Sequence, residues 1–203
     1  MKKALNRLGF CLLTACLVWT ASIIADRQTL NQELIRLHVV AASDSQEDQN
    51  MKLRVRDIVV ASLQESMKDV TDTQQARAYL QEHLPKIEEL ANRVLRESGC
   101  TDRAEVSLQL EEFATRYYDT FTLPAGIYEA LRITIGPGAG QNWWCVVFPT
   151  LCVGATVAEF EETAQCAGLS EQLTGALTGE KSYEVRFFLL DALGRMENFL
   201  HKG

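Results

Sequence analysis

The chain has 203 residues, of which 47% are apolar and 23% are charged, and its formal net charge is −7. This composition is typical of a globular protein, and the length suits one domain that is stable without a metal or many disulfides. The acidic balance argues against a nucleic-acid-binding protein, because phosphate binding needs clustered Lys and Arg side chains.

The first 25 residues are predicted to direct export. Three basic residues near the start precede residues 8–25, a run of 18 residues without a charge. As a helix this run would be about 27 Å long, close to the hydrocarbon thickness of a bilayer. The basic residues should stay in the cytoplasm, so residues 26–203 are expected outside it as a single domain.

Two forms of this export segment are open. A cleaved signal peptide needs small residues before the cut, and Ala25 suits the last position, whereas Ile23 is bulky for the third from last. An uncleaved membrane anchor fits the length of the run at least as well. In that second form, residues 8–25 would attach the domain to the membrane.

The first part of the body predicts a strand followed by a helix. Residues 34–41 alternate, with apolar side chains on one face and Arg36 and His38 on the other, as expected for a strand. A polar turn follows. Ser45 in this turn can cap the helix that the apolar spacing predicts over 46–68.

A second helix and a change of period come next. Helical spacing predicts a helix over 73–98, in which Pro85 should cause a kink or a split, and Gly99 suits its end. From residue 104 the period changes to two, and apolar and polar residues alternate as far as Glu111. This alternation predicts a further strand.

The remaining elements are two strands and a C-terminal helix. Strands are predicted over 127–135 and 143–148, and the glycine-rich segment 136–140 between them is interpreted as a hairpin loop. Residues 154–182 show no clear pattern of a helix or a strand, whereas 184–201 has the apolar spacing of an amphipathic helix. We therefore predict an α+β domain with a mixed or antiparallel sheet of about four strands. Three or four helices would pack on this sheet, and an N-terminal apolar helix would precede it.

Cysteines in the exported body suggest one disulfide. Cys145 and Cys152 are seven residues apart with Pro149 between them, and a turn there could bring them within disulfide range. Closing this loop would stabilise the fold by roughly 2.5 kcal/mol. The alternative is that all four body cysteines are reduced, and the state of Cys100 and Cys166 is left open.

Few residues have the spacing of a metal-binding, nucleotide-binding or catalytic site. The three histidines show no metal-ligand spacing, and the glycine-rich loop lacks the pattern of a nucleotide-binding loop. No metal, cofactor or small-molecule substrate is therefore expected. His38, Ser43 and Asp44 lie close together at a strand end, where catalytic loops often lie, although no G-x-S-x-G motif accompanies them. A membrane-anchored envelope hydrolase that uses His38 and Ser43 is the alternative function.

Trp143 and Trp144 are adjacent on a predicted strand, so their side chains should point to opposite faces of the sheet. One of them is then expected to pack inside, and the other to face outward as an anchor for a protein partner. Both would be covered if helices lie on both faces of the sheet.

Three segments resemble the stage II sporulation protein R family of endospore-forming bacteria. They are IRLHVVAASDSQEDQNMKLRVRDIVV (35–60), LPAGIYEALRITIG (123–136) and GPGAGQNWWCVVFPTLC (136–152). Ala42 stands where the family usually has Asn, and Thr150 stands where it usually has a second Pro. The segments follow the family's order and cover much of the body.

This resemblance implies a signalling role and no catalytic activity. Family members are made in the forespore and exported into the space between the forespore and mother-cell membranes. There they activate a membrane-embedded aspartic protease of the mother cell, which processes a pro-sigma factor. A purely structural septal protein is a third possibility, and it would leave sigma-factor processing unaffected.

We expect receptor contacts from the polar turn, from one face of the helix after it and from the tryptophan pair. The candidate partner-binding residues are His38, Ser43, Asp44, Asp48, Lys52, Arg56, Asp57, Trp143 and Trp144. A ligand of this kind would act by binding the active arrangement of the receptor better than the inactive one.

Overall fold

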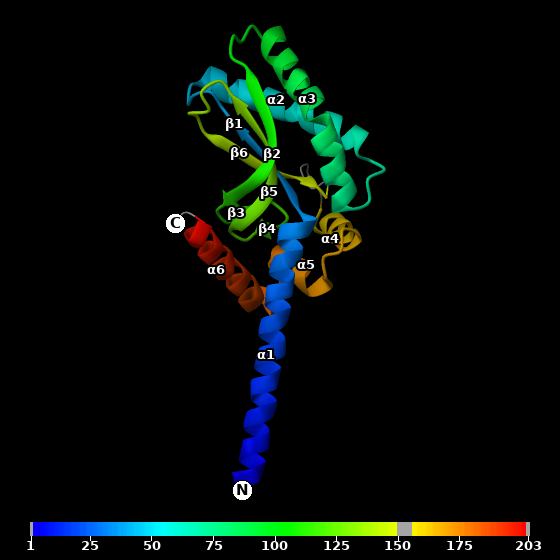
Figure 1. The fold of residues 1–203 in the computed structure, drawn as a ribbon, viewed down its shortest axis with the longest axis vertical. Coiled ribbons are helices and arrows are strands. Elements are labelled where there is room, and N and C mark those ends of the chain that lie inside the picture. Colours follow the sequence, from blue (N-terminus) through cyan, green and yellow to red (C-terminus); the bar gives the residue numbers. More distant parts are fainter. Residues whose placement is uncertain (1, 150–155, 202–203) are drawn as a thin grey trace.

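The computed structural model describes residues 2–149 and 156–201. It has the predicted α+β architecture, with a four-stranded mixed sheet and a long N-terminal helix (Figure 1). The strands of the main sheet are β1 (Ile35–Val40), β2 (Ala104–Phe113), β5 (Gly126–Ile135) and β6 (Asn142–Phe148), in the spatial order β2-β5-β1-β6. A small second sheet pairs β3 (Arg116–Tyr117) with β4 (Thr122–Leu123).

Helices surround this sheet. They are α1 (Lys2–Glu33), α2 (Gln46–Ser66), α3 (Thr73–Glu97), α4 (Val157–Cys166), α5 (Glu171–Thr178) and α6 (Glu184–His201), with a 3₁₀ turn η1 (Lys181–Tyr183) before α6. The four predicted strands and the three predicted body helices are all present. The short helices α4 and α5 were not predicted, although Thr156 and Ser170 cap them in the usual way. The helix α3 is continuous from Thr73 to Glu97. Pro85 lies inside it and does not split it.

The strand β1 is central and not an edge strand. It runs parallel to β5 and antiparallel to β6, and all six of its residues are buried. Its apolar side chains face α2 and α3, whereas Arg36 and His38 face the opposite side, as the alternation predicted.

The segment between β5 and β6 is not a hairpin loop, contrary to the sequence prediction. The strand β1 lies between β5 and β6, so the connection has to pass over the end of β1. Two backbone hydrogen bonds hold it there: the amide of Gly140 donates to the carbonyl of Ala41 (3.0 Å), and Ala139 donates to Ala42 (3.1 Å). We call residues 136–141 the crossing loop.

Each face of the sheet has its own core. One core lies between the sheet and the pair α2 and α3. The other lies beneath the C-terminal end of α1 and the helices α4 to α6, which Figure 1 shows grouped around that end of α1. Both cores are built from aliphatic and aromatic side chains, whose removal from water is the main favourable contribution to folding.

The helix α1 has two parts with different surroundings. Residues Asn6–Glu33 include a stretch that is long and apolar enough to cross a membrane, judged by length and composition. In Figure 1 the N-terminal part of α1 projects from the domain. Near Ala25 the helix continues without a break, and Ile23 and Leu30 are buried in the second core.

Side chains of α1 and α6 form ion pairs where the two helices cross. Asp26 pairs with Arg186, and both side chains are about one-tenth exposed. Arg27 pairs with Glu197 at 2.7 Å and also donates to the hydroxyl of Tyr128 at 3.1 Å. These buried contacts determine where α6 lies along α1, because a charge left unpaired there would be strongly destabilising.

A glycine allows α6 to approach β5. A Cβ atom at Gly194 would lie 1.7 Å from the carbonyl oxygen of Ala125. We expect Gly194→Ala to lower the free energy of unfolding by about 1–3 kcal/mol, because the helix must move away from the sheet. Urea unfolding of the full chain in detergent measures this change. Met196→Ala, on the outer side of the same helix, is the control, and an unaltered midpoint for Gly194→Ala would contradict this packing.

Candidate functional site

The polar turn after β1 is ordered by its own side chains. The hydroxyl of Ser45 accepts a hydrogen bond from the amide of Asp48 at 3.1 Å, which caps α2 as predicted. The hydroxyl of Ser43 donates to the carboxylate of Asp48 at 2.5 Å and accepts from the amide of Ser45. Ser43 and Asp48 therefore hold the turn in one conformation.

The crossing loop lies directly on this turn. The amide of Gln141 donates to the carboxylate of Asp44 at 2.7 Å. A Cβ atom at Gly140 would lie 2.2 Å from the carbonyl oxygen of Ser43, so only glycine allows this approach. Two segments that are almost 100 residues apart in the sequence thus form one surface.

Lys52 joins the turn, the loop and α2. Its ammonium group donates to the carbonyl oxygen of Gln141 at 3.0 Å and to the side chain of Gln49 at 2.6 Å, and the residue is buried. Burial lowers the pKa of Lys52, the neighbouring charge of Arg56 lowers it further, and Asp44 raises it. Because Lys52 is covered, it positions the loop and cannot itself be an exposed contact.

Three further side chains lie near the loop: Asp57 and Trp143 are exposed, and Arg56 is half-buried, with 19% of its side chain accessible. The guanidinium carbon of Arg56 lies 4.2 Å from the centre of the Trp143 ring, and a nitrogen of the same group lies 2.6 Å from the Asp57 carboxylate. Trp143 is 39% exposed. We call the set Ser43, Asp44, Arg56, Asp57, Trp143 and the crossing loop the turn–loop surface.

His38 and Trp144 lie on the opposite face of the sheet. Their rings are stacked, with centres 5.6 Å apart, and the guanidinium carbon of Arg116 lies 3.4 Å from the centre of the Trp144 ring. The two tryptophans therefore point to opposite faces as predicted. Neither ring is fully buried, and an arginine lies over each: Arg56 of α2 over Trp143, and Arg116 of β3 over Trp144. The nine candidate residues accordingly form two groups and not one.

Both ring nitrogens of His38 have oxygen partners. One nitrogen lies 2.6 Å from the carboxylate of Glu111, and the other lies 2.8 Å from the side-chain oxygen of Asn142. Arg132 binds the second oxygen of Glu111 at 2.9 Å. The sequence analysis missed Glu111, Asn142 and Arg132. The alternation of β2 places Glu111 on a polar face, but only the strand register places it beside His38.

In the structure, His38 and Ser43 are not placed as the base and the nucleophile of a hydrolase would be. The ring nitrogens of His38 contact Glu111 and Asn142, and the Ser43 hydroxyl is bound to Asp48. Within the described residues no hydrogen bond joins His38 to Ser43. A hydrolase would need the serine hydroxyl within reach of a base.

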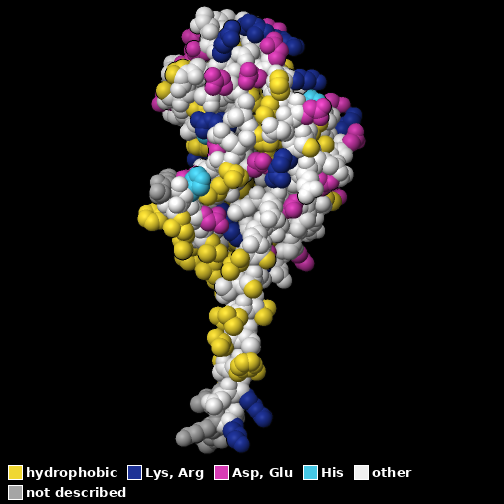
Figure 2. All heavy atoms as spheres, in the orientation of Figure 1, with side chains coloured by type: hydrophobic (Ala, Val, Ile, Leu, Met, Phe, Trp, Pro, Cys, Tyr) yellow, Lys and Arg dark blue, Asp and Glu magenta, His cyan; other side chains and the backbone are white. Residues whose placement is uncertain are grey.

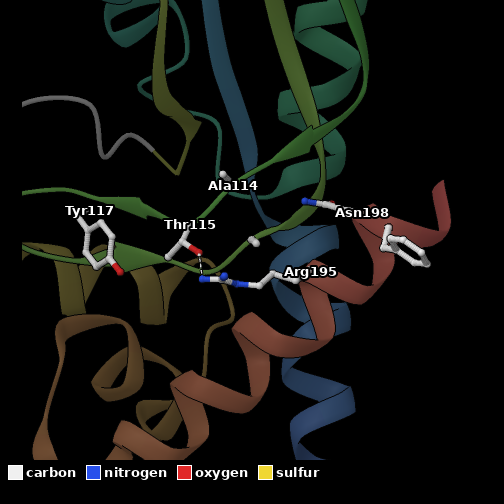
Figure 3. A pocket seen from close by; sticks show the side chains of 7 residues that line it. Ala114, Thr115, Tyr117, Arg195 and Asn198 are labelled. Atoms are coloured by element: carbon white, nitrogen blue, oxygen red, sulfur yellow. Dashed lines mark hydrogen bonds between the residues drawn. The ribbon is translucent and has the colours of Figure 1, made fainter. Parts of the chain in front are cut away.

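In the described ranges no group of three or more His, Cys, Asp or Glu side chains is placed to hold a metal ion. A pocket of about 500 Å³ lies between α6 and the end of β2, away from the turn–loop surface. Figure 3 shows Thr115 and Arg195 joined inside it by a hydrogen bond of 3.5 Å. Its lining includes no carboxylate, histidine or cysteine, and so has no acid–base pair.

Glu111 gives the sheet a pH-dependent contribution to stability. Burial would raise its pKa, but hydrogen bonds from His38 and Arg132 lower it from 4.5 to about 2. Because this pKa is lower in the folded than in the unfolded protein, the ionised carboxylate stabilises the fold above about pH 4.5. That stabilisation is lost as the pH falls toward 2, and at neutral pH it is on the order of 3 kcal/mol.

We therefore expect Glu111→Gln to lower the free energy of unfolding near neutral pH. The difference from the wild type should shrink as the pH is lowered through the range where the unfolded carboxyl group becomes protonated. Urea unfolding at a series of pH values measures both effects. Glu162→Gln, at an exposed position on α4, is the control. A difference for Glu111→Gln that does not change with pH would refute this account.

The predicted disulfide involves a residue outside the described range. Cys145 is buried and is not among the free cysteines of the described residues, which are Cys11, Cys16, Cys100 and Cys166. Cys152 lies outside the described residues, so the Cys145–Cys152 pairing stays a prediction.

Alkylation of the unfolded but unreduced protein tests this pairing. We expect Cys100 and Cys166 to react, and Cys145 and Cys152 to react only after reduction, because a disulfide sulfur carries no thiolate. Mass spectrometry of the peptides reads out each position. Alkylation of Cys145 before reduction would show that the bond is absent.

Comparison with known proteins places the chain in a family. The family model described as stage II sporulation protein R matches residues 31–158. Stage II sporulation protein R of Bacillus subtilis (strain 168) is 32% identical over 206 aligned residues, which cover 90% of this chain and 92% of that protein. No solved structure matches. The matched region contains β1, the turn and the crossing loop, and the chain belongs to the stage II sporulation protein R family.

Proposed function

We propose that this protein is an exported signal of endospore formation. It is made in the forespore and acts in the space between the forespore and mother-cell membranes. There it activates a membrane-embedded aspartic protease of the mother cell, which processes a pro-sigma factor. Family membership supports this proposal, as does an N-terminal helix that is apolar and long enough for a signal peptide or an anchor.

One observation carries the choice of contact surface. Two of the three segments that carry the family resemblance, 35–60 and 136–152, are far apart in the sequence, yet their polar parts meet at the turn–loop surface. The hydrogen bonds of Ser43, Asp44 and Lys52 order the turn and the crossing loop and give this surface a defined shape. A preorganised surface binds a partner at a lower cost in conformational entropy.

Arg56, Asp57 and Trp143 are the side chains of this surface proposed to touch the protease. Tryptophan and arginine are enriched among the residues that dominate binding energy, and here they stack on one another at the edge of the sheet. Asp57 is the most exposed of the three, with 63% of its side chain accessible. On the opposite face, the partly exposed Trp144 is a second candidate contact, whereas His38 is buried and, like Lys52, would position its neighbours.

The protein would act by shifting a conformational equilibrium in the receptor. It would bind the active arrangement of the protease more tightly than the inactive one, and the ratio of the two affinities limits how far it can shift the population. This mechanism requires no catalytic residue in the signalling protein. No observation favours the envelope hydrolase over this function.

Reconstitution in a non-sporulating bacterium tests the function. The bacterium would express this protein, the matching receptor protease and its pro-sigma substrate, and cleavage would be followed on a gel. We expect cleavage only when this protein is present and only when residues 1–25 are retained for export. Absence of cleavage with all three proteins folded, and this one exported, would overturn the proposal.

Variants in the same assay test the contact surface. We expect Trp143→Ala and Asp57→Lys each to reduce the initial cleavage rate by about tenfold or more, since hot-spot side chains contribute about 2 kcal/mol or more to binding. Arg54→Ala, at an exposed position of the same helix, is the matched control. Amounts of exported protein and thermal unfolding show whether each variant is folded. Wild-type cleavage with both Trp143→Ala and Asp57→Lys would remove this surface from the proposed contact.

A further inference from the structure

Two charged residues of α6, Arg186 and Asp191, face the domain beside Leu190, unlike the charged residues of an ordinary surface helix. Arg186 is buried against Asp26, and Asp191 is buried where it accepts hydrogen bonds from the amide of Ala125 (2.8 Å) and from Thr115 (2.5 Å). Surface helices normally turn their charged residues to water and their apolar residues to the core.

The outward side of α6 is apolar along its whole length. Its exposed large side chains recur at helical spacing and share one face, and each is between 60% and 79% exposed. They are Val185, Phe188, Met196, Phe199 and Leu200. We call this set the outer stripe. The spacing of the stripe in the sequence predicted an amphipathic helix, but the stripe faces away from the core that it was expected to fill.

The outer stripe lies next to the apolar part of α1. The two helices cross at Asp26 and Arg27, directly after the uncharged run 8–25. If that run is inside a bilayer, the crossing lies at the bilayer surface. Figure 2 shows hydrophobic side chains over α6 that reach the point where α1 leaves the domain, and further ones along α1 below it.

We propose that the outer stripe of α6 binds the lipid surface of the membrane into which α1 inserts. Amphipathic helices bind bilayers in this way, with the apolar face placed at the boundary of headgroups and acyl chains. Lipid fits better than a protein partner because the apolar surface is continuous with a helix of membrane-spanning length, and exposed apolar patches of this extent are rare on soluble proteins.

Polar and aromatic residues border the stripe, as expected at headgroup level. The Arg195 side chain is 68% exposed beside the stripe, and Tyr117 is 79% exposed across the pocket of Figure 3 from α6. Arg can pair with lipid phosphates, and tyrosine is enriched at membrane interfaces. Spanning helices also tilt within the bilayer, which allows α6 to come to the surface.

This contact would orient the whole domain. It rests on α1 entering the membrane and adds a second membrane contact to the proposed function. In Figure 1, α2 lies at the end of the molecule opposite the N-terminus, with β1 and β6 extending toward it. A domain held by both α1 and α6 would therefore present the turn–loop surface away from its own membrane.

Spin labelling of the full chain tests the proposal. A nitroxide would be attached at Met196→Cys or Val185→Cys after Cys11, Cys16, Cys100 and Cys166 are changed to Ala. The protein would be placed in vesicles of phosphatidylethanolamine and phosphatidylglycerol. Collision rates with oxygen, which concentrates in lipid, and with a water-soluble nickel chelate would then be compared. Glu65→Cys on α2 is the water control, and Leu17→Cys in α1 is the lipid control.

We expect the oxygen-to-nickel collision ratio at Met196→Cys and Val185→Cys to be several-fold higher than at Glu65→Cys and closer to that at Leu17→Cys. A ratio equal to that of Glu65→Cys would overturn the proposal. Low collision rates with both reagents would also overturn it, since they would mean that protein covers the stripe. If the collision ratio at Leu17→Cys also equalled that at Glu65→Cys, the premise that α1 enters the bilayer would be wrong. The receptor protease is absent here, so this result is independent of the activation assay.

Discussion

The position of β1 between β5 and β6 is the constraint on which the rest of this structure depends. The strand enters directly from α1, is hydrogen-bonded on both sides and is completely buried. Since β5 and β6 cannot pair with each other, the chain between them must pass over the end of β1. The same placement joins the N-terminal helix to the centre of the sheet.

The turn–loop surface follows from that crossing. The crossing loop lies on the turn that leaves β1. Gly140 allows a close backbone approach there, and Asp44 and Lys52 each make one hydrogen bond with Gln141 of the loop. Such contacts fix the backbone at the cost of conformational entropy. The result is a rigid base for the exposed Trp143 and the half-buried Arg56 that stacks on it, which suits a surface that has to distinguish two states of a receptor.

Buried charges determine the arrangement at the other end of the molecule. Asp26 and Arg27 on α1 pair with Arg186 and Glu197 on α6. The Asp26–Arg186 pair and the Arg27 side chain are largely shielded from water, whereas Glu197 is partly exposed. Buried ion pairs are weak evidence for stability, but separating the partners is costly, so they favour one alignment of the helices over its alternatives. Arg186 and Asp191 of α6 point inward, and the exposed large hydrophobic side chains of this helix lie on its outer face. The two ends of the domain thus differ in chemistry, one polar and aromatic, the other apolar and close to the helix of membrane-spanning length.

The sequence by itself determined the features that depend on neighbouring residues. The strand at 34–41, its two faces, the Ser45 cap, the uncharged run 8–25 and the extent of α6 all follow from local spacing. Tertiary structure alone decided the strand order, and with it the replacement of a hairpin by a crossing loop. It also decided the pairing of His38 with Glu111, 73 residues away, and the direction in which the outer stripe faces. A periodic pattern shows that a helix has an apolar face, but not what that face touches. Arg186 reaches Asp26 across 160 residues, and α6 makes this contact in the orientation that leaves the outer stripe facing outward.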